Sequence, residues 1–111
     1  MKKQTYWKAI RGENKSIRFE EAQGYVIDLT DQRGYTVKIA LEYLRPYWYA
    51  THYESGLSCM PYRDIKEYPH RSNEYKSKEE LIEQLKQSDF EKAIKPCTSI
   101  IKRLADFINK N

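Results

Sequence analysis

The stretch YVIDLTDQRGYTVKIALEY, at residues 25–43, decides the fold. Apolar side chains alternate with polar or small ones from Tyr35 to Tyr43, and a shorter alternation covers residues 25–29. A period of two is typical of a strand that buries one of its faces. Gly34 lies in the connecting segment, where glycine adopts the left-handed conformation of a short hairpin loop without steric cost. The stretch therefore predicts an antiparallel hairpin.

Further strands are predicted on both sides of this hairpin. Residues 5–11 and 17–21 read as short strands, while Pro46 ends the ladder after the hairpin. Beyond Pro46 we expect a second hairpin with Ser55 and Gly56 as its two-residue loop, which places His52 opposite Cys59. This pairing sorts the side chains into a core face, made of Trp48, Ala50, His52, Leu57 and Cys59, and an outer face, made of Tyr47, Tyr49, Thr51, Tyr53 and Met60.

The last third of the chain reads as helical. Ser77-Lys-Glu-Glu80 is a capping box and predicts a helix over residues 78–87. The segment from Ser88 to Glu91 repeats the signature, and one apolar stripe continues over residues 89–109 with a break or kink expected at Pro96. We expect this stripe to pack on the sheet, and the alternative use is a homodimer interface through the C-terminal helix.

Together these elements predict one α+β domain over residues 1–111, with an antiparallel sheet of four or five strands and C-terminal helices packed on one face. The domain divides into a strand-rich part, 1–60, a loop, 61–76, and a helical part, 77–110. Apolar residues make up 40% of the chain and charged residues 32%, which is the balance of a folded domain and excludes a disordered tail.

Composition also bounds the environment of the protein. No run of residues approaches the roughly 18 consecutive apolar positions of a membrane span, and the first residues lack the apolar stretch of a secretory signal. We therefore expect a cytoplasmic protein in which Cys59 and Cys97 are reduced. The net charge of +4 is too small to indicate a strong nucleic-acid binder by itself.

No motif indicates catalysis or a cofactor. His52, Cys59, His70 and Cys97 lack the close pairing of ligands in a structural zinc site. A nucleophilic pair of His52 and Cys59 is an alternative, but apolar neighbours favour a buried neutral imidazole beside an inert thiol. A nuclease-like cluster of Asp64 and Lys66 with Asp28 or Asp31 is the nearest acid pattern, and it lacks the expected strand context. The sequence predicts a protein that is not an enzyme and needs no metal or cofactor.

Binding is the remaining class of function, and two versions of it are open. Tyr, Trp and Arg dominate the hot spots of protein interfaces, which favours a protein partner. The predicted protein contact consists of Tyr47, Tyr49, Tyr53, Tyr62 and Arg63. The alternative is single-stranded nucleic acid, since aromatic planes stack on unpaired bases while cations neutralise phosphates. Its predicted contact consists of Arg45, Trp48, Arg63, Lys66 and Arg71.

The segment WYATHYESGL at 48–57, followed by a loop and KSKEEL at 76–81, resembles a strand-turn-strand-helix arrangement in small accessory proteins of phages and other mobile elements of Gram-positive bacteria. Some proteins of that kind inhibit host defence enzymes by binding them. The resemblance covers about a third of the chain and lies in a structural hairpin, so it implies no catalytic residues. It implies a small protein that acts on a host or defence factor by occupying its surface.

Overall fold

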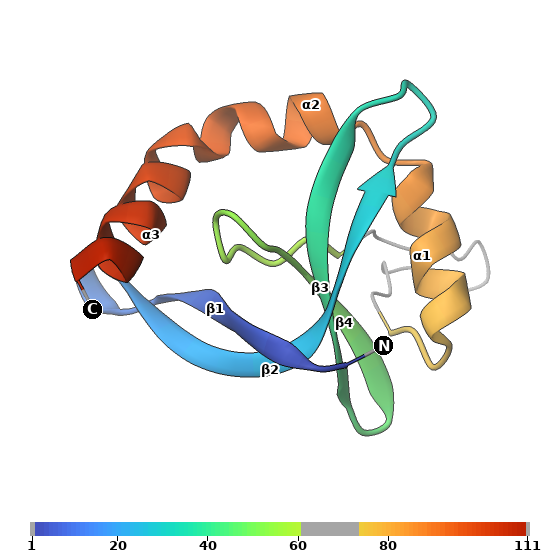
Figure 1. Ribbon diagram of the computed structural model, residues 1–111, viewed down its shortest axis with the longest axis horizontal. Coiled ribbons are helices and arrows are strands. Elements are labelled where there is room, and N and C mark those ends of the chain that lie inside the picture. Colours follow the sequence, from blue (N-terminus) through green and yellow to red (C-terminus); the bar gives the residue numbers. More distant parts are fainter. Residues whose placement is uncertain (1, 61–73, 111) are drawn as a thin grey trace.

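The computed structural model describes residues 2–60 and 74–110 and confirms the α+β fold (Figure 1). Four strands form one antiparallel sheet in the order β1-β2-β3-β4. The strands are β1 Gln4–Arg11, β2 Ile17–Thr30, β3 Thr36–Leu44 and β4 Tyr47–His52. The helices are α1 Lys78–Lys86, α2 Phe90–Ile94 and α3 Thr98–Lys110, with short 3-10 turns η1 Glu13–Lys15 and η2 Lys95–Cys97. Within these described ranges no helix has the length and apolar character needed to cross a bilayer.

The long strand β2 connects two halves of the sheet. Its first half pairs with β1 and its second half with β3, so the strands expected at 17–21 and 25–29 are parts of one element (Figure 1). Gly24 lies where the pairing changes from one neighbour to the other. A side chain here would force the neighbouring strand to shift, since a Cβ atom would lie 2.6 Å from the Leu41 carbonyl oxygen and 2.9 Å from the Tyr6 ring. Glycine at this position lets Tyr6 cross β2 and donate a hydrogen bond to Glu42, 2.9 Å away.

The hairpin between β2 and β3 forms as predicted, with Gly34 at φ +85°. Asp31 organises it, because its carboxylate accepts hydrogen bonds from the backbone amides of Arg33 at 2.9 Å and Tyr35 at 3.0 Å. The second carboxylate oxygen accepts from the backbone amide of Phe90, at 2.9 Å. Asp31 thus fastens the start of α2 to the hairpin, while Asp64 and Lys66 of the nuclease-like pattern lie outside the described residues.

The turn after β4 differs from the prediction. The expected two-residue loop at Ser55 and Gly56 is wrong, because Thr51 pairs with Ser58 and the His52 amide donates to the Leu57 carbonyl at 2.9 Å. Residues 53–56 therefore form the turn, which Gly56 closes at φ +75°. The pairing is shifted by two residues relative to the prediction, and an even shift does not exchange the two faces of the paired residues, up to Cys59.

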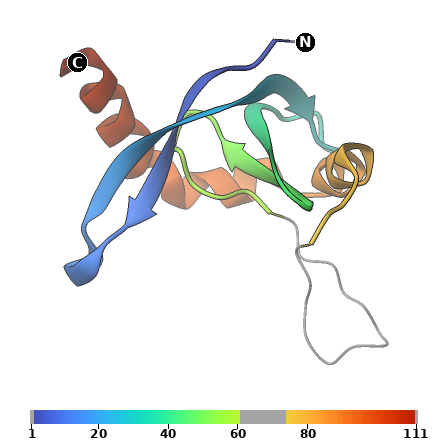
Figure 2. The same ribbon diagram turned by 90° about the horizontal axis from the view of Figure 1, so that it is seen from below.

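This turn also closes the sheet onto its first strand. The Ala9 amide on the open edge of β1 donates to the Gly56 carbonyl oxygen, at 2.8 Å. The turn over residues 53–56 lies between the sheet and α3 in both views (Figures 1 and 2). β1 is therefore held on one edge by β2 and on the other by the end of β4.

Two of the predicted helix signals are confirmed and one is shifted. Ser77 caps α1, accepting from the Glu80 amide at 3.3 Å. The predicted cap at Ser88 is wrong by one residue, since Asp89 caps α2 by accepting from the Lys92 amide at 3.2 Å. Pro96 interrupts the helix as expected, and the 3-10 turn η2 joins α2 to α3.

The main core lies between the sheet and the helices α1 and α2. It consists of Leu29, Val37, Ile39, Leu41, Ala50, Tyr75, Leu81, Leu85 and Phe90. Tyr75 lies in the predicted loop, outside any helix or strand, and its side chain is fully buried in this core. One expectation fails: Met60, predicted on the outer face, packs against the core with its sulfur accepting from the Ala50 amide. The Cys59 amide still donates to the Ala50 carbonyl oxygen at 3.0 Å, so the departure from the predicted face begins after Cys59.

The third helix covers the other half of the sheet. Phe107 packs edge-on against Trp7, with ring centroids 5.1 Å apart, and against Phe19 at 5.2 Å. Leu104 on the same helix is 2% exposed. The apolar stripe of α3 is thus used mainly inside the domain, while Ile108 remains exposed.

Candidate binding surface

An aromatic cluster lies where β3 and β4 meet, and we call this region the hairpin end: Tyr43, Leu44, Arg45, Pro46, Tyr47 and Trp48. Arg45 and Pro46 form a two-residue connection, so that Leu44 pairs with Tyr47 and Tyr43 with Trp48. The hairpin end extends beyond β1 and β2 (Figure 1). This geometry places aromatic and aliphatic side chains at a protruding edge of the molecule.

The exposure of these side chains marks them as unusual. Tyr43 and Leu44 are 49% and 48% exposed, although both are large and apolar. The Tyr43 ring packs on the Trp48 indole at a centroid distance of 5.2 Å. Trp48 itself is half-buried, because its inner side packs against the core. The indole was predicted as a core residue, and the structure shows that it belongs to both the core and the surface.

Positive charge surrounds the aromatic rings. The Lys78 ammonium lies 5.8 Å from the Trp48 ring centroid and 6.0 Å from that of Tyr25. The Lys3 ammonium lies 5.9 Å from the Tyr25 ring on the same side of the sheet. Arg45 is exposed at the tip. Cations at these distances are attracted to the ring faces, so the lysine side chains are held beside the cluster.

The predicted tyrosine face is not a continuous patch. Tyr47 is half-buried next to Glu74, whose negative charge raises the pKa of the Tyr47 phenol. Tyr49 pairs with Glu42 across the strands. Tyr53 lies at the far end of β4, where it lines a pocket of about 200 Å³ with residues of α3. Among the described residues of the predicted protein contact, Tyr47 alone belongs to the hairpin end.

The remaining predicted contact residues divide in the same way. Arg45 and Trp48, predicted for nucleic acid, both lie in the hairpin end. Tyr62, Arg63, Lys66 and Arg71 lie outside the residues that the structure describes. The sequence interpretation missed Tyr43, Leu44 and Tyr25. A two-residue turn at Arg45-Pro46, read from the sequence, would have paired Tyr43 with Trp48 and indicated the cluster.

The candidate catalytic pair has the surroundings of an inert site. His52 is buried, and its Nδ1 atom lies 2.7 Å from the Ser55 hydroxyl, which also accepts from the Leu57 amide at 3.2 Å. Burial lowers the pKa of His52, so the imidazole is neutral near pH 7. Burial also raises the pKa of the Cys59 thiol to about 11. Over residues 2–60 and 74–110, no cluster of three or more His, Cys, Asp or Glu side chains is arranged to hold a metal ion.

The reactivity of Cys59 provides a direct test. A rise in its pKa from 9.0 to about 11 lowers the thiolate fraction near pH 8 by about 100-fold. In a Cys97→Ser variant, we expect a disulfide reagent such as DTNB to modify Cys59 slowly in the native protein and rapidly in guanidinium chloride. Fast modification of the native variant would mean that Cys59 is an activated nucleophile.

Comparisons with known proteins found no matching family model, no matching curated protein and no matching solved structure. The geometry of the chain itself is therefore the basis for any functional assignment.

Proposed function

We propose that this protein is a non-enzymatic binding protein that covers a surface of a protein partner with its hairpin end. The observation that supports this most is the exposure of Tyr43, whose ring packs on the Trp48 indole, and of Leu44, which pairs with Tyr47 on the opposite face of the hairpin. A partner that covers large apolar side chains gains about 25 cal/mol of binding free energy for each Å² of apolar surface removed from water. Tyr, Trp and Arg are also the residue types that concentrate binding energy, and the hairpin end carries all three.

The cations around the aromatic cluster indicate the chemistry of the partner's surface. Lys3, Arg45 and Lys78 place three cations at or beside the hairpin end. A complementary surface would combine an apolar cleft that receives the hairpin end, with Tyr43 against one wall and Leu44 against the other, with acidic residues at its rim. The resemblance to small proteins of mobile elements supports a host or defence factor as that partner and inhibition by occupation as the mode of action.

The proposal is tested by capture and by paired variants. Tagged protein is used to capture partners from a bacterial lysate treated with nuclease, and the affinity of the captured protein is then measured for three forms of this chain. We expect the double variant Tyr43→Ala/Leu44→Ala to bind about 100-fold more weakly than wild type, which corresponds to loss of a hot spot. Tyr35→Ala is the control, because Tyr35 is 39% exposed at the opposite hairpin.

Two results would contradict the proposal. Equal binding by wild type and the double variant, with both variants folded by circular dichroism, would place the contact elsewhere. Loss of all capture after nuclease treatment, together with affinity that falls steeply with salt, would favour the nucleic-acid alternative through Arg45 and Trp48.

A further inference from the structure

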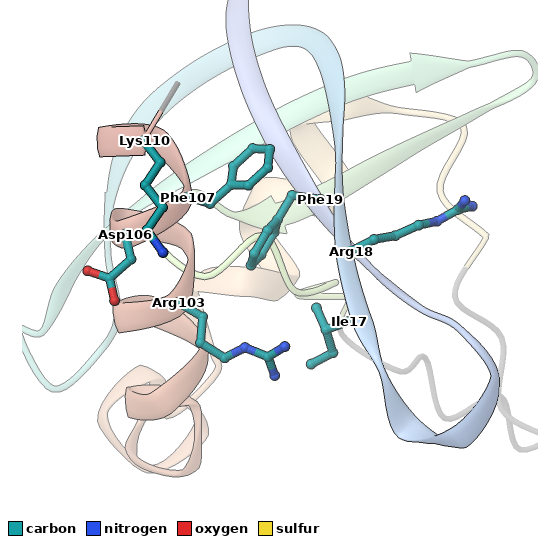
Figure 3. Close-up of a pocket in the computed structure, with 7 residues that line it drawn as sticks. All are labelled: Ile17, Arg18, Phe19, Arg103, Asp106, Phe107 and Lys110. Atoms are coloured by element: carbon teal, nitrogen blue, oxygen red, sulfur yellow. The ribbon is translucent and has the colours of Figure 1, made fainter.

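A second candidate site, separate from the hairpin end, lies between the start of β2 and the last turns of α3 (Figure 3). It is an open groove with a volume of about 460 Å³, which is in the range of small-ligand sites. Its lining consists of Ile17, Arg18 and Phe19 from β2 and Arg103, Asp106, Phe107 and Lys110 from α3. The proposed protein contact uses none of these residues.

The inner wall of the groove is aromatic and rigid. Phe19 and Phe107 lie side by side on this wall (Figure 3), with ring centroids 5.2 Å apart. Phe107 is held from behind by the edge-on contact with Trp7 at 5.1 Å. Rings fixed by such packing lose little conformational freedom when a planar ligand stacks on them.

The rim of the groove is positively charged. Arg103 and Lys110 are two helical turns apart on one face of α3, about 10 Å along the helix axis. The Arg103 side chain points into the space between Phe19 and Ile17, the Lys110 side chain runs back along α3 toward Asp106, and Arg18 points away from the groove (Figure 3). Arg18 pairs with Glu20 at 2.9 Å, but neither Arg103 nor Lys110 pairs with a carboxylate of the described residues. The groove therefore combines an aromatic wall with two cations that can bind an anionic ligand.

We infer that this groove binds one or two nucleotides of a single-stranded nucleic acid. A base would stack on the exposed side of Phe19, and the flanking phosphates would contact Arg103 and Lys110. Stacking and charge are sequence-tolerant, so the groove binds without strong base preference.

Charge removal on α3 is the first test. We compare wild type, Arg103→Ala/Lys110→Ala and the control Lys92→Ala/Lys95→Ala by fluorescence anisotropy with a labelled oligothymidylate. The control removes the same charge at exposed positions near α2. The groove variant should bind about tenfold or more weakly in low salt, and its slope of log affinity against log salt should be shallower by about 1.4. The control should lose at most about threefold.

The two tryptophans make the location of binding testable as well. In a Trp48→Phe variant Trp7 is the only indole, and it contacts Phe107 behind the groove. We expect the oligonucleotide to change the Trp7 emission with the same dissociation constant as in anisotropy. Equal losses in both double variants, binding without a change in Trp7 emission, or equal affinity for oligoglutamate would each overturn the inference. Failure here leaves the hairpin-end proposal intact, since that proposal is tested after nuclease treatment.

Discussion

Replacing Asp31 with asparagine is expected to lower the melting temperature by about 10 °C. The carboxylate accepts backbone hydrogen bonds from Arg33 and Tyr35 on one oxygen and from Phe90 on the other. Asparagine keeps a single acceptor oxygen, so its amide group would face the Phe90 N–H, donor against donor. The measurement is thermal unfolding followed by circular dichroism. Asp28→Asn is the control, because Asp28 is exposed on β2 and should change the melting temperature by no more than about 2 °C.

The same variant should show a pH signature. The hydrogen bond from the Phe90 amide is the main reason that the pKa of Asp31 lies below its ordinary value of 3.8. A group with a lowered folded-state pKa contributes its stability in full above the unfolded-state pKa and loses it as the pH falls through the folded-state pKa. The difference between wild type and Asp31→Asn should therefore be constant above about pH 5 and shrink below about pH 4. A constant difference down to pH 2 would show that ionisation of Asp31 contributes nothing.

Replacing Gly56 with alanine is expected to cost about 3 kcal/mol or more of unfolding free energy. Gly56 has φ +75°, which disfavours any side chain. An added Cβ atom would also lie 2.6 Å from the Trp7 carbonyl oxygen and 2.8 Å from the Ala9 nitrogen, both on β1. Backbone atoms cannot yield as a flexible side chain does, so β1 must move away from the turn. Urea or guanidinium denaturation measures the loss, and hydrogen exchange of the Ala9 amide shows where it occurs.

Gly34→Ala separates the cost of a positive φ from the cost of a close approach to β1. Gly34 has φ +85°, but an added Cβ atom would meet no atom within 4 Å. Its cost is therefore conformational only, about 1 kcal/mol. If Gly56→Ala were no more costly than Gly34→Ala, the close approach of the turn to β1 would contribute nothing to stability.

Much of the fold follows from local sequence signals. Four signals that act over a few residues have the predicted outcome: the alternation up to Tyr43, the glycine at position 34, the cap at Ser77 and the break at Pro96. The errors arise where residues distant in the sequence determine the local structure. Ser55-Gly56 reads as a tight loop, but Gly56 also has to approach β1, and the turn extends back to Tyr53. No sequence pattern near residue 56 predicts that contact.

The candidate sites were harder to predict for a related reason. The sequence indicated that tyrosines next to Trp48 form a contact, but it could not tell which of them the protein covers itself. Tyr53 lies against α3, while Tyr43 is exposed across the strand from Trp48. The groove at Phe19 joins segments more than eighty residues apart in the chain. Neither segment carries a motif, and only the packing of α3 on β1 and β2 brings their cations and rings together.

That packing has a consequence for biosynthesis. Phe107 completes the hydrophobic contact with Trp7 and Phe19, so these two side chains stay uncovered until residue 107 has been translated. Contacts between residues so far apart in the chain form late, because the intervening segment has to be ordered first. We therefore expect a nascent chain in which the hairpin of β2 and β3 is folded while Trp7 and Phe19 are still exposed. Chaperones can bind these exposed side chains until α3 docks.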